Sequence, residues 1–282
     1  MAANVDDRRI SIAELGVATR VLSAGSGSTV LMLHGNPDNA DEWGPLIERL
    51  SQRYRCIAPD FPGYGKSPMP PASFTYSLAD QVAFVDCVLK AMSVTDRVIL
   101  VVHDTGGMVG TAWAAANLDR LRGVVVTNTV AFDGFPWFST ARQWGDQSLL
   151  GRLRSSFGMA AIGWGGGRLF KKIFAAQCPQ LDADELDRFA KSFAMNSDAK
   201  RVTLRQFRQI MQPGFFKDFA GMRQRILERT PCRVLWGEGD NFISVQYAQS
   251  FGSKQVTILP NVGHWVALIA PDALAAEVDA IA

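Results

Sequence analysis

Short apolar runs alternate with segments of helical periodicity over the first half of the chain. Residues 98–102 (VILVV) are leucine and β-branched residues without interruption, a pattern typical of a strand covered on both faces. Residues 77–92 instead carry apolar side chains at helical spacing, and Ser77 is the expected N-cap. Similar apolar runs predict further strands at residues 20–23, 28–33, 55–59, 123–127, 233–237 and 255–259.

Helices are also expected at residues 108–117 and 271–281. Strands that alternate with helices at this spacing form parallel sheets with crossover connections. The chain is therefore predicted to have an α/β fold, with a mostly parallel sheet and helices on both faces.

The pattern changes between residues 133 and 229, where no convincing strand is found and glycines at 163 and 165–167 interrupt helical stretches. We therefore predict a core made of residues 1–132 and 230–282, with residues 133–229 inserted as a helical cap. Residues 134–229 hold 16 Lys and Arg against 8 Asp and Glu, while the remainder holds 13 against 19. Opposite charges favour contact between the two parts, although a solvated basic surface is the alternative.

Composition limits the partners of this protein. Of the 282 residues, 48% are hydrophobic and 20% are charged, which are ordinary values for a globular protein. No apolar run approaches the roughly 18 residues of a membrane span, and a net charge of +2 gives no argument for nucleic acid. The N-terminal segment has early acidic residues and no apolar core, unlike a secretory signal, and the four cysteines are scattered; together they predict a cytoplasmic protein with reduced thiols. We expect a monomer or a homodimer.

The segment VVHDTGG, which follows the apolar run at 98–102, predicts a strand, a tight turn and a helix. Such a turn lifts the side chain of Asp104 above the sheet edge and points the N–H of Thr105 at the same space. This arrangement is the nucleophile elbow of α/β-hydrolases, with Asp at the position of the nucleophile. The alternative is that Asp104 only caps the helix.

Two further residues follow the last predicted strands. Asp240 lies in WGEGD, and His264, one of three histidines, lies in NVGHW. Nucleophile, acid and histidine is the chain order of an α/β-hydrolase triad. All three follow the carboxyl ends of strands, where open α/β sheets build their sites. We therefore expect Asp104, Asp240 and His264 to meet.

Five motifs occur in order along the chain: HGNP, DFPGYGKS, HDTGG, WGEGD and NVGHW. Through them the chain resembles the α/β-hydrolase superfamily, and HGNP with VVHDTGG most resembles its haloalkane dehalogenase and epoxide hydrolase branch. The resemblance implies that Asp104 attacks a carbon atom and forms an alkyl ester. His264, oriented by Asp240, would then activate the water that hydrolyses this ester. The N–H groups of Asn36 and Thr105 would hold the oxyanion.

The leaving group distinguishes the two halves of that branch. Epoxide hydrolases supply two cap tyrosines as acids, but the four tyrosines here lie outside residues 133–229. A halide needs donors and no proton, and Asn36 stands where similar dehalogenases have a halide-binding Asn. Thr105 replaces their second donor, a Trp. Trp137, Trp144 and Trp164 are candidates to supply the missing indole N–H from the cap pocket. The alternative for each of them is packing in the protein core.

The acid could also lie elsewhere. Some dehalogenases keep it after the strand that precedes the cap, but Asn128 stands there and an amide cannot serve. Asp133 and Glu238 are weaker candidates than Asp240.

Taken together, these residues predict a hydrolase that cleaves a carbon–halogen bond in a small organohalogen, with water as co-substrate and no metal or cofactor. An epoxide or another small electrophile is the alternative substrate. A non-catalytic ligand-binding protein is a third possibility, against which the complete triad argues.

Overall fold

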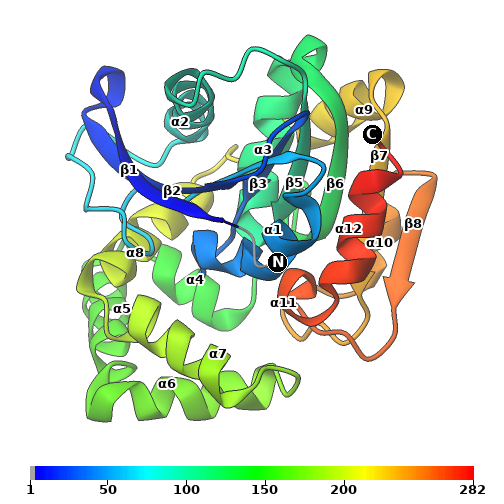
Figure 1. Cartoon of the computed structure of the whole chain (residues 1–282). Coiled ribbons are helices and arrows are strands. Elements are labelled where there is room, and N and C mark those ends of the chain that lie inside the picture. Colours follow the sequence, from blue (N-terminus) through cyan, green and yellow to red (C-terminus); the bar gives the residue numbers. More distant parts are fainter. Residues whose placement is uncertain (1–3) are drawn as a thin grey trace.

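A single eight-stranded sheet runs through the molecule, with helices on both sides (Figure 1). The computed structural model describes residues 4–282. The strand order is β1-β2-β4-β3-β5-β6-β7-β8; β2 is antiparallel to β1 and β4, and all other pairs are parallel. The mostly parallel sheet expected from the sequence is confirmed. The strands are β1 (Asp6–Ile12), β2 (Val17–Ala24), β3 (Thr29–Leu33), β4 (Arg55–Pro59), β5 (Val98–His103), β6 (Leu121–Thr129), β7 (Cys232–Gly237) and β8 (Gln255–Leu259).

Alternate residues of β5 contribute to two separate apolar clusters, one on each face of the sheet. Leu100 and Val102 pack with α2, α3 and α10, whereas Ile99 and Val101 pack with α1, α11 and α12. This double burial explains the uninterrupted apolar sequence of β5. The helices are α1 (Gly44–Leu50), α2 (Leu78–Ala91), α3 (Asp104–Ala116), α10 (Gln246–Ser250), α11 (Val266–Ile269) and α12 (Pro271–Asp279), with short turns η1 (Ala13–Leu15), η2 (Ala40–Trp43) and η3 (Leu118–Arg120).

Most element boundaries lie close to those predicted. Strands β4 and β8 match their predicted residues, and the Ser77 side chain caps α2 by accepting the Asp80 N–H. The sequence analysis missed β1, whose charged and mostly exposed residues lie at the edge of the sheet. Charged side chains are common on edge strands because they oppose pairing with other chains.

Six helices lie between β6 and β7, and no strand interrupts them within residues 130–231. We call α4–α8 the cap helices; with Trp265 of the core they form an apolar cluster of their own. The last inserted helix, α9, packs instead against α3, with Phe219 and Ile226 in the main core. The helices are α4 (Ser139–Gly145), α5 (Leu149–Ala161), α6 (Trp164–Gln177), α7 (Ala183–Phe189), α8 (Ser197–Ile210) and α9 (Phe219–Arg229), with a π turn η4 (Ala190–Ala194).

A charged contact joins the cap helices to the core. Arg188 of α7 donates two hydrogen bonds, of 2.6 and 3.1 Å, to the carboxylate of Asp38, which is buried in the loop after β3. This contact pairs a basic residue of the cap with an acidic residue of the core, in the sense expected from the charge distribution.

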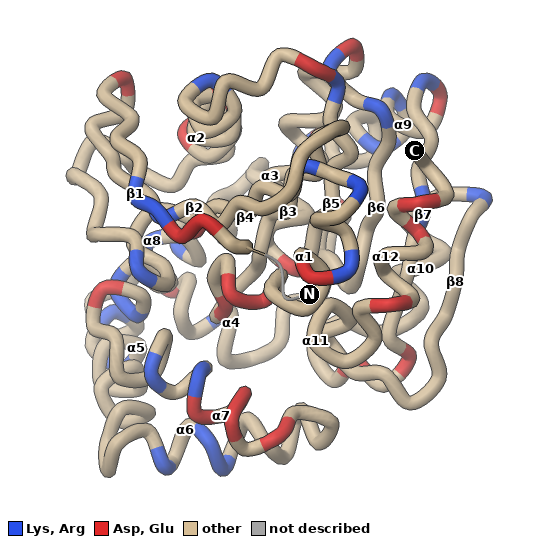
Figure 2. Tube along the Cα trace, viewed as in Figure 1, with Lys and Arg blue, Asp and Glu red and all other residues tan. Residues whose placement is uncertain are grey.

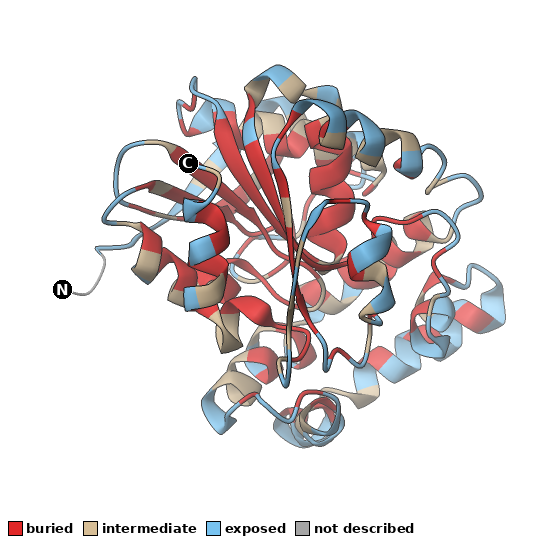
Figure 3. Ribbon diagram, turned by 90° about the vertical axis from the view of Figure 1, so that its right-hand side faces the viewer, coloured by how far each residue is buried: buried red, intermediate tan, exposed pale blue. Residues whose placement is uncertain are grey.

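Figure 3 contrasts the buried strands with the exposed stretches of the surrounding helices. Within residues 4–282, no helix combines the length and apolarity that crossing a membrane requires.

Candidate active site

Asp104 occupies a tight turn between β5 and α3. Its backbone has a φ of +47°, in the left-handed region, and its carbonyl accepts a hydrogen bond of 2.8 Å from the Thr129 hydroxyl. A Cβ at Gly106 would overlap the carbonyl oxygen of Leu33, and one at Gly107 would overlap the side chain of Thr129. The glycines of HDTGG therefore allow the turn to sit close against β3 and β6.

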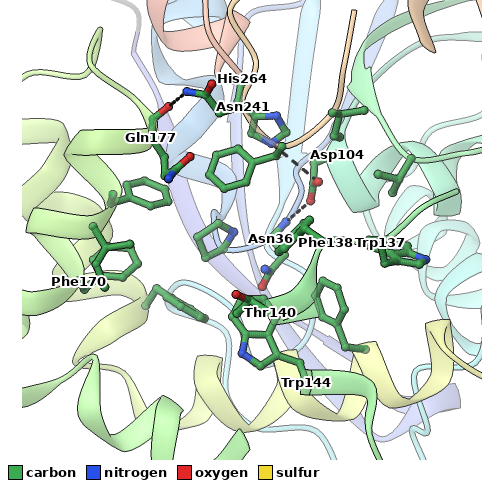
Figure 4. Close-up of a pocket in the computed structure, with 18 of the residues that line it drawn as sticks. Asn36, Asp104, Trp137, Phe138, Thr140, Trp144, Phe170, Gln177, Asn241 and His264 are labelled. Atoms are coloured by element: carbon green, nitrogen blue, oxygen red, sulfur yellow. Dashed lines mark hydrogen bonds and ion pairs between the residues drawn. The ribbon is translucent and has the colours of Figure 1, made fainter. Parts of the chain in front are cut away.

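The two carboxylate oxygens of Asp104 have different surroundings (Figure 4). Oδ1 accepts a 2.7 Å hydrogen bond from the backbone N–H of Asn36. Oδ2 lies 3.8 Å from Nε2 of His264, which is too long for a hydrogen bond. One oxygen is thus held by the backbone, while the other faces the imidazole and the pocket.

His264 is oriented by a buried carboxylate. Its Nδ1 lies 2.7 Å from Oδ2 of Asp240, and Oδ1 of Asp240 accepts the N–H groups of Phe242 and Ile243 at 2.7 and 3.0 Å. Burial raises the pKa of Asp240, but His264 and these donors outweigh it, and the net pKa is lowered. When Nδ1 of a neutral His264 ring donates to Asp240, the nitrogen that carries no proton is Nε2, which faces Asp104.

Asn128, which the sequence analysis set aside because an amide cannot act as the acid, supports Asp240 directly. Its Nδ2 donates to Oδ2 of Asp240 at 2.7 Å, and its Oδ1 accepts the N–H of Gly237 at 2.9 Å. The side chain is fully buried at the end of β6, beside β7. The sequence signal for this contact is the position itself, because adjacent parallel strands end at the same sheet edge.

Asn36 is also held by its side chain. Oδ1 accepts a 2.8 Å hydrogen bond from the hydroxyl of Thr203 on α8, and Asn36 lines the pocket beside Asp104. Because the oxygen already has a partner, the amide Nδ2 remains as a donor. Thr203 was not found in the sequence analysis, since it lies in the cap helices and belongs to no motif.

A cavity of about 420 Å³ lies between the cap helices and the Asp104–His264 pair. Trp137 and Trp144, two of the three tryptophans considered for the cap pocket, line it. Trp164 is not part of this lining: it is 61% exposed and its ring packs against Phe157. Thr105 is buried at the start of α3 and is likewise not part of the lining. Most other lining side chains are apolar, including Ile162, Phe170, Phe174, Phe193, Phe207 and Phe242.

No tyrosine between residues 4 and 282 lines this cavity. The hydroxyl of Tyr64 is buried and donates to Oε1 of Gln206 at 2.7 Å, and burial raises the pKa of Tyr64 above its usual value. The phenol of Tyr64 is therefore held by Gln206 behind the cavity lining and is a poor proton donor to a bound molecule.

The other two histidines lie near the site without reaching the cavity. His34 binds the carbonyl of Gly35 through Nδ1 and the N–H of Phe61 through Nε2, both at 2.8 Å. Burial lowers the pKa of His34 to about 4, so its ring is neutral. His103 pairs with Glu42, another residue the sequence analysis did not single out, at 2.6 Å. Burial alone would lower the pKa of His103, but the Glu42 carboxylate outweighs it and raises the value to about 9.

Comparison with known proteins agrees with this architecture. The sequence model described as "Alpha/beta hydrolase family" matches residues 30–277. A cis-3-alkyl-4-alkyloxetan-2-one decarboxylase of Xanthomonas campestris is 37% identical over 143 residues, which are 46% of this chain and 48% of that protein. This chain thus spans about half the length of that relative. A haloalkane dehalogenase of Sphingobium indicum is 28% identical over 217 residues, which are 71% of this chain and 70% of the other.

Among solved structures, one described under "novel epoxide hydrolases belonging to the alpha/beta hydrolases superfamily", from metagenomes of hot environments, superposes with a TM-score of 0.76. The alignment covers 98% of both chains at 18% identity. This structural likeness shows the shared fold.

Proposed function

The chain belongs to the alpha/beta hydrolase family. We propose that it falls in the haloalkane dehalogenase and epoxide hydrolase branch of that family and hydrolyses a small organohalogen through an ester on Asp104. The observation that carries this proposal is the asymmetric setting of the Asp104 carboxylate. One oxygen accepts the Asn36 N–H, and the other is open to an apolar cavity and to His264.

The first step would be a displacement at carbon. Oδ2 of Asp104 forms the new C–O bond, and the carbon–halogen bond breaks with its electron pair leaving on the halide. No proton moves in this step, so a carboxylate nucleophile needs no base to activate it. The products of this step are an alkyl ester on Asp104 and a free halide.

The second step would be hydrolysis of that ester. His264 Nε2 takes a proton from water, and the hydroxide attacks the ester carbonyl. The N–H groups of Asn36 and Thr105 would stabilise the oxyanion, and the alcohol leaves with the proton that His264 held. Asp240 would stabilise the imidazolium, and the Asn128 amide supports Asp240 in that role.

The departing halide needs hydrogen-bond donors. Nδ2 of Asn36 is the first, because Thr203 occupies the amide oxygen. An indole N–H of Trp137 or Trp144, both of which line the cavity, is the second. These donors would replace the Trp that similar dehalogenases have at the position of Thr105.

A second candidate substrate is a strained lactone. The oxetan-2-one decarboxylase is 37% identical over its aligned part. Attack of Asp104 at the alkyl carbon of such a ring breaks the ring C–O bond and leaves a carboxylate, which, like a halide, needs no proton. The C–C bond to that carboxylate would then break with loss of carbon dioxide as the ester C–O bond breaks, which gives an alkene and restores the Asp104 carboxylate. An epoxide oxygen needs an acid, and no tyrosine within residues 4–282 lines the cavity, so an epoxide ranks third.

The test is a panel of small haloalkanes, haloacids, cis-3,4-dialkyl oxetan-2-ones and epoxides, with Asp104→Ala as the blank. Halide, carbon dioxide and diol are measured separately. The proposal expects halide and alcohol in equal amounts from at least one organohalogen. Carbon dioxide or diol formation without any halide release would replace it with the corresponding alternative.

A further inference from the structure

Helix α5 carries an apolar stripe on its solvent side. The stripe consists of Leu149, Leu150, Leu153 and Phe157, whose exposed fractions are 78, 54, 62 and 65%. At about 100° per residue these four positions fall within roughly 100° of the helix circumference. The buried residues of α5 occupy the opposite side. Monomeric proteins rarely leave such a continuous apolar surface in water, so this face fits a partner.

The stripe continues into the glycine-rich start of α6. The rings of Phe157 and Trp164 meet edge to face with centroids 5.9 Å apart, and Trp164 is followed by three glycines of positive φ, 165–167. Within residues 4–282, Trp164 is the one tryptophan that is exposed. Exposed tryptophans at loop positions are frequent where proteins meet the interface of a lipid bilayer.

Cations border this apolar surface. Residues 149–177 contain five Lys and Arg and no Asp or Glu. On the helical wheel, Arg152 and Arg154 lie on either side of the α5 stripe. Arg168 and Lys172 are exposed on α6, and the neighbouring acidic residues are Asp146, which precedes α5, and those of α7 (Figure 2). Within α5 and α6, the charged residues beside the apolar surface are therefore all basic.

We propose that this face, formed by α5 and the first turn of α6, docks on an anionic lipid surface. Leu153, Phe157 and Trp164 would enter the boundary of the acyl chains, and the arginines would lie at the phosphate groups. Contact between two copies of this same face would bring like charges together, which opposes a symmetric dimer.

The docking face continues into the candidate active site. Ile173 of α6 is 51% exposed and also lines the cavity, as does half-buried Ile162 between Phe157 and Trp164. An apolar molecule dissolved in the lipid would thus meet the cavity beside the docked face. This delivery of substrate rests on the proposed function, whereas the docking itself does not.

The first experiment is flotation of the full chain with vesicles. Vesicles of phosphatidylcholine with equal phosphatidylglycerol are compared with vesicles of phosphatidylcholine alone. We expect binding to the anionic vesicles only, decreasing with salt. Each cation near such a surface contributes about fivefold, so Arg152→Gln with Arg154→Gln should weaken binding about twenty-fivefold. The matched control is Arg225→Gln with Arg229→Gln on α9, which should change little.

The second experiment locates the contact. Brominated lipids in the anionic vesicles should quench tryptophan fluorescence, and Trp164→Phe should remove most of that quenching. Phe157→Ser should abolish flotation while leaving the circular dichroism spectrum unchanged, because the side chain is exposed. Turnover of a water-soluble substrate should be the same in Phe157→Ser and wild type, so docking and catalysis are tested separately.

Three results would overturn the proposal. They are no flotation with anionic vesicles, equal binding to both kinds of vesicle, and quenching that persists in Trp164→Phe. A concentration-dependent dimer that Phe157→Ser dissociates, without any vesicle binding, would assign the face to a second copy of the chain instead.

Discussion

Oε1 of Glu42 lies 2.6 Å from Nδ1 of His103, and both side chains are almost completely buried. The ring of His103 in turn contacts that of His264, with centroids 4.4 Å apart. Glu42 comes from η2, the turn before α1, and His103 from the end of β5, so the pair joins these two elements beside His264. The pair therefore fixes one side of the pocket in which His264 must keep its orientation.

Glu42→Gln should destabilise the protein because it leaves a buried histidine without its counter-charge. Removing one partner of a buried pair costs about 3–5 kcal/mol. Glu42 raises the pKa of His103 to about 9, above the unfolded value of 6.5. The contribution of the Glu42–His103 pair to the free energy of unfolding is thus fully present below pH 6.5 and is lost as the pH rises through about 9. Urea unfolding at pH 6 and pH 9 should show this loss in wild type and a flatter response in Glu42→Gln.

Glu48→Gln is the control for that series, because Glu48 lies on α1 with a side chain that is 62% exposed. It should change the unfolding free energy by less than about 0.5 kcal/mol at either pH. If Glu42→Gln behaves like this control, the buried pair does not stabilise the fold.

Substitution of Asn36 should slow halide release more than substitution of Thr203 does. Asn36→Ala removes the donor itself, and a hydrogen bond to a charged group is worth about 1.5–3 kcal/mol, so kcat/KM should fall about ten- to a hundredfold. Thr203→Val keeps the side-chain shape but frees the Asn36 amide oxygen, and should give a smaller loss. Unchanged halide release in Asn36→Ala, together with good turnover of a substrate without halogen, would exclude the dehalogenase assignment.

Asn128→Ala should slow ester hydrolysis and change its pH dependence. The Asn128 amide is one of the groups that lower the pKa of Asp240. Without it the pKa of Asp240 rises, and the acidic limb of the hydrolysis rate should move to higher pH. Single-turnover hydrolysis followed against pH measures this limb; a rate reduced equally at every pH would instead indicate general misfolding.

The sequence predicted the sheet well because its parallel strands are buried on both faces and read as apolar runs. Strand β1 escaped prediction because an edge strand tolerates charge, so its residues lack that pattern. Asp104, Asp240 and His264 were found through their positions after strands. Their proximity in the structure agrees with that prediction, while their catalytic roles remain predictions.

Contacts between segments far apart in the chain could not be predicted from the sequence. Thr203 reaches Asn36 across 167 residues, and no local pattern marks it. Glu42 is likewise an ordinary acidic residue until the fold places it against His103. Trp164 was a candidate for the cap pocket as a source of an indole N–H, whereas the structure leaves it 61% exposed, before three glycines of positive φ.

Asp104→Ala should abolish turnover and leave the fold intact, because little of the core depends on that carboxylate. Circular dichroism and urea unfolding establish the fold, and the product assay establishes activity. Loss of a nucleophile typically costs several orders of magnitude in kcat. Activity above about a thousandth of wild type would show that another group attacks the substrate.

The central claim is a covalent ester on Asp104 that His264 resolves, and mass spectrometry of His264→Gln tests it most directly. His264 Nε2 lies 3.8 Å from Oδ2 of Asp104 and is not needed for the first displacement. The variant exposed to a reactive organohalogen should therefore release one halide per chain and gain the mass of the alkyl group. Digestion should locate that mass on the peptide containing Asp104. An unmodified protein, with no burst of halide, would contradict the account.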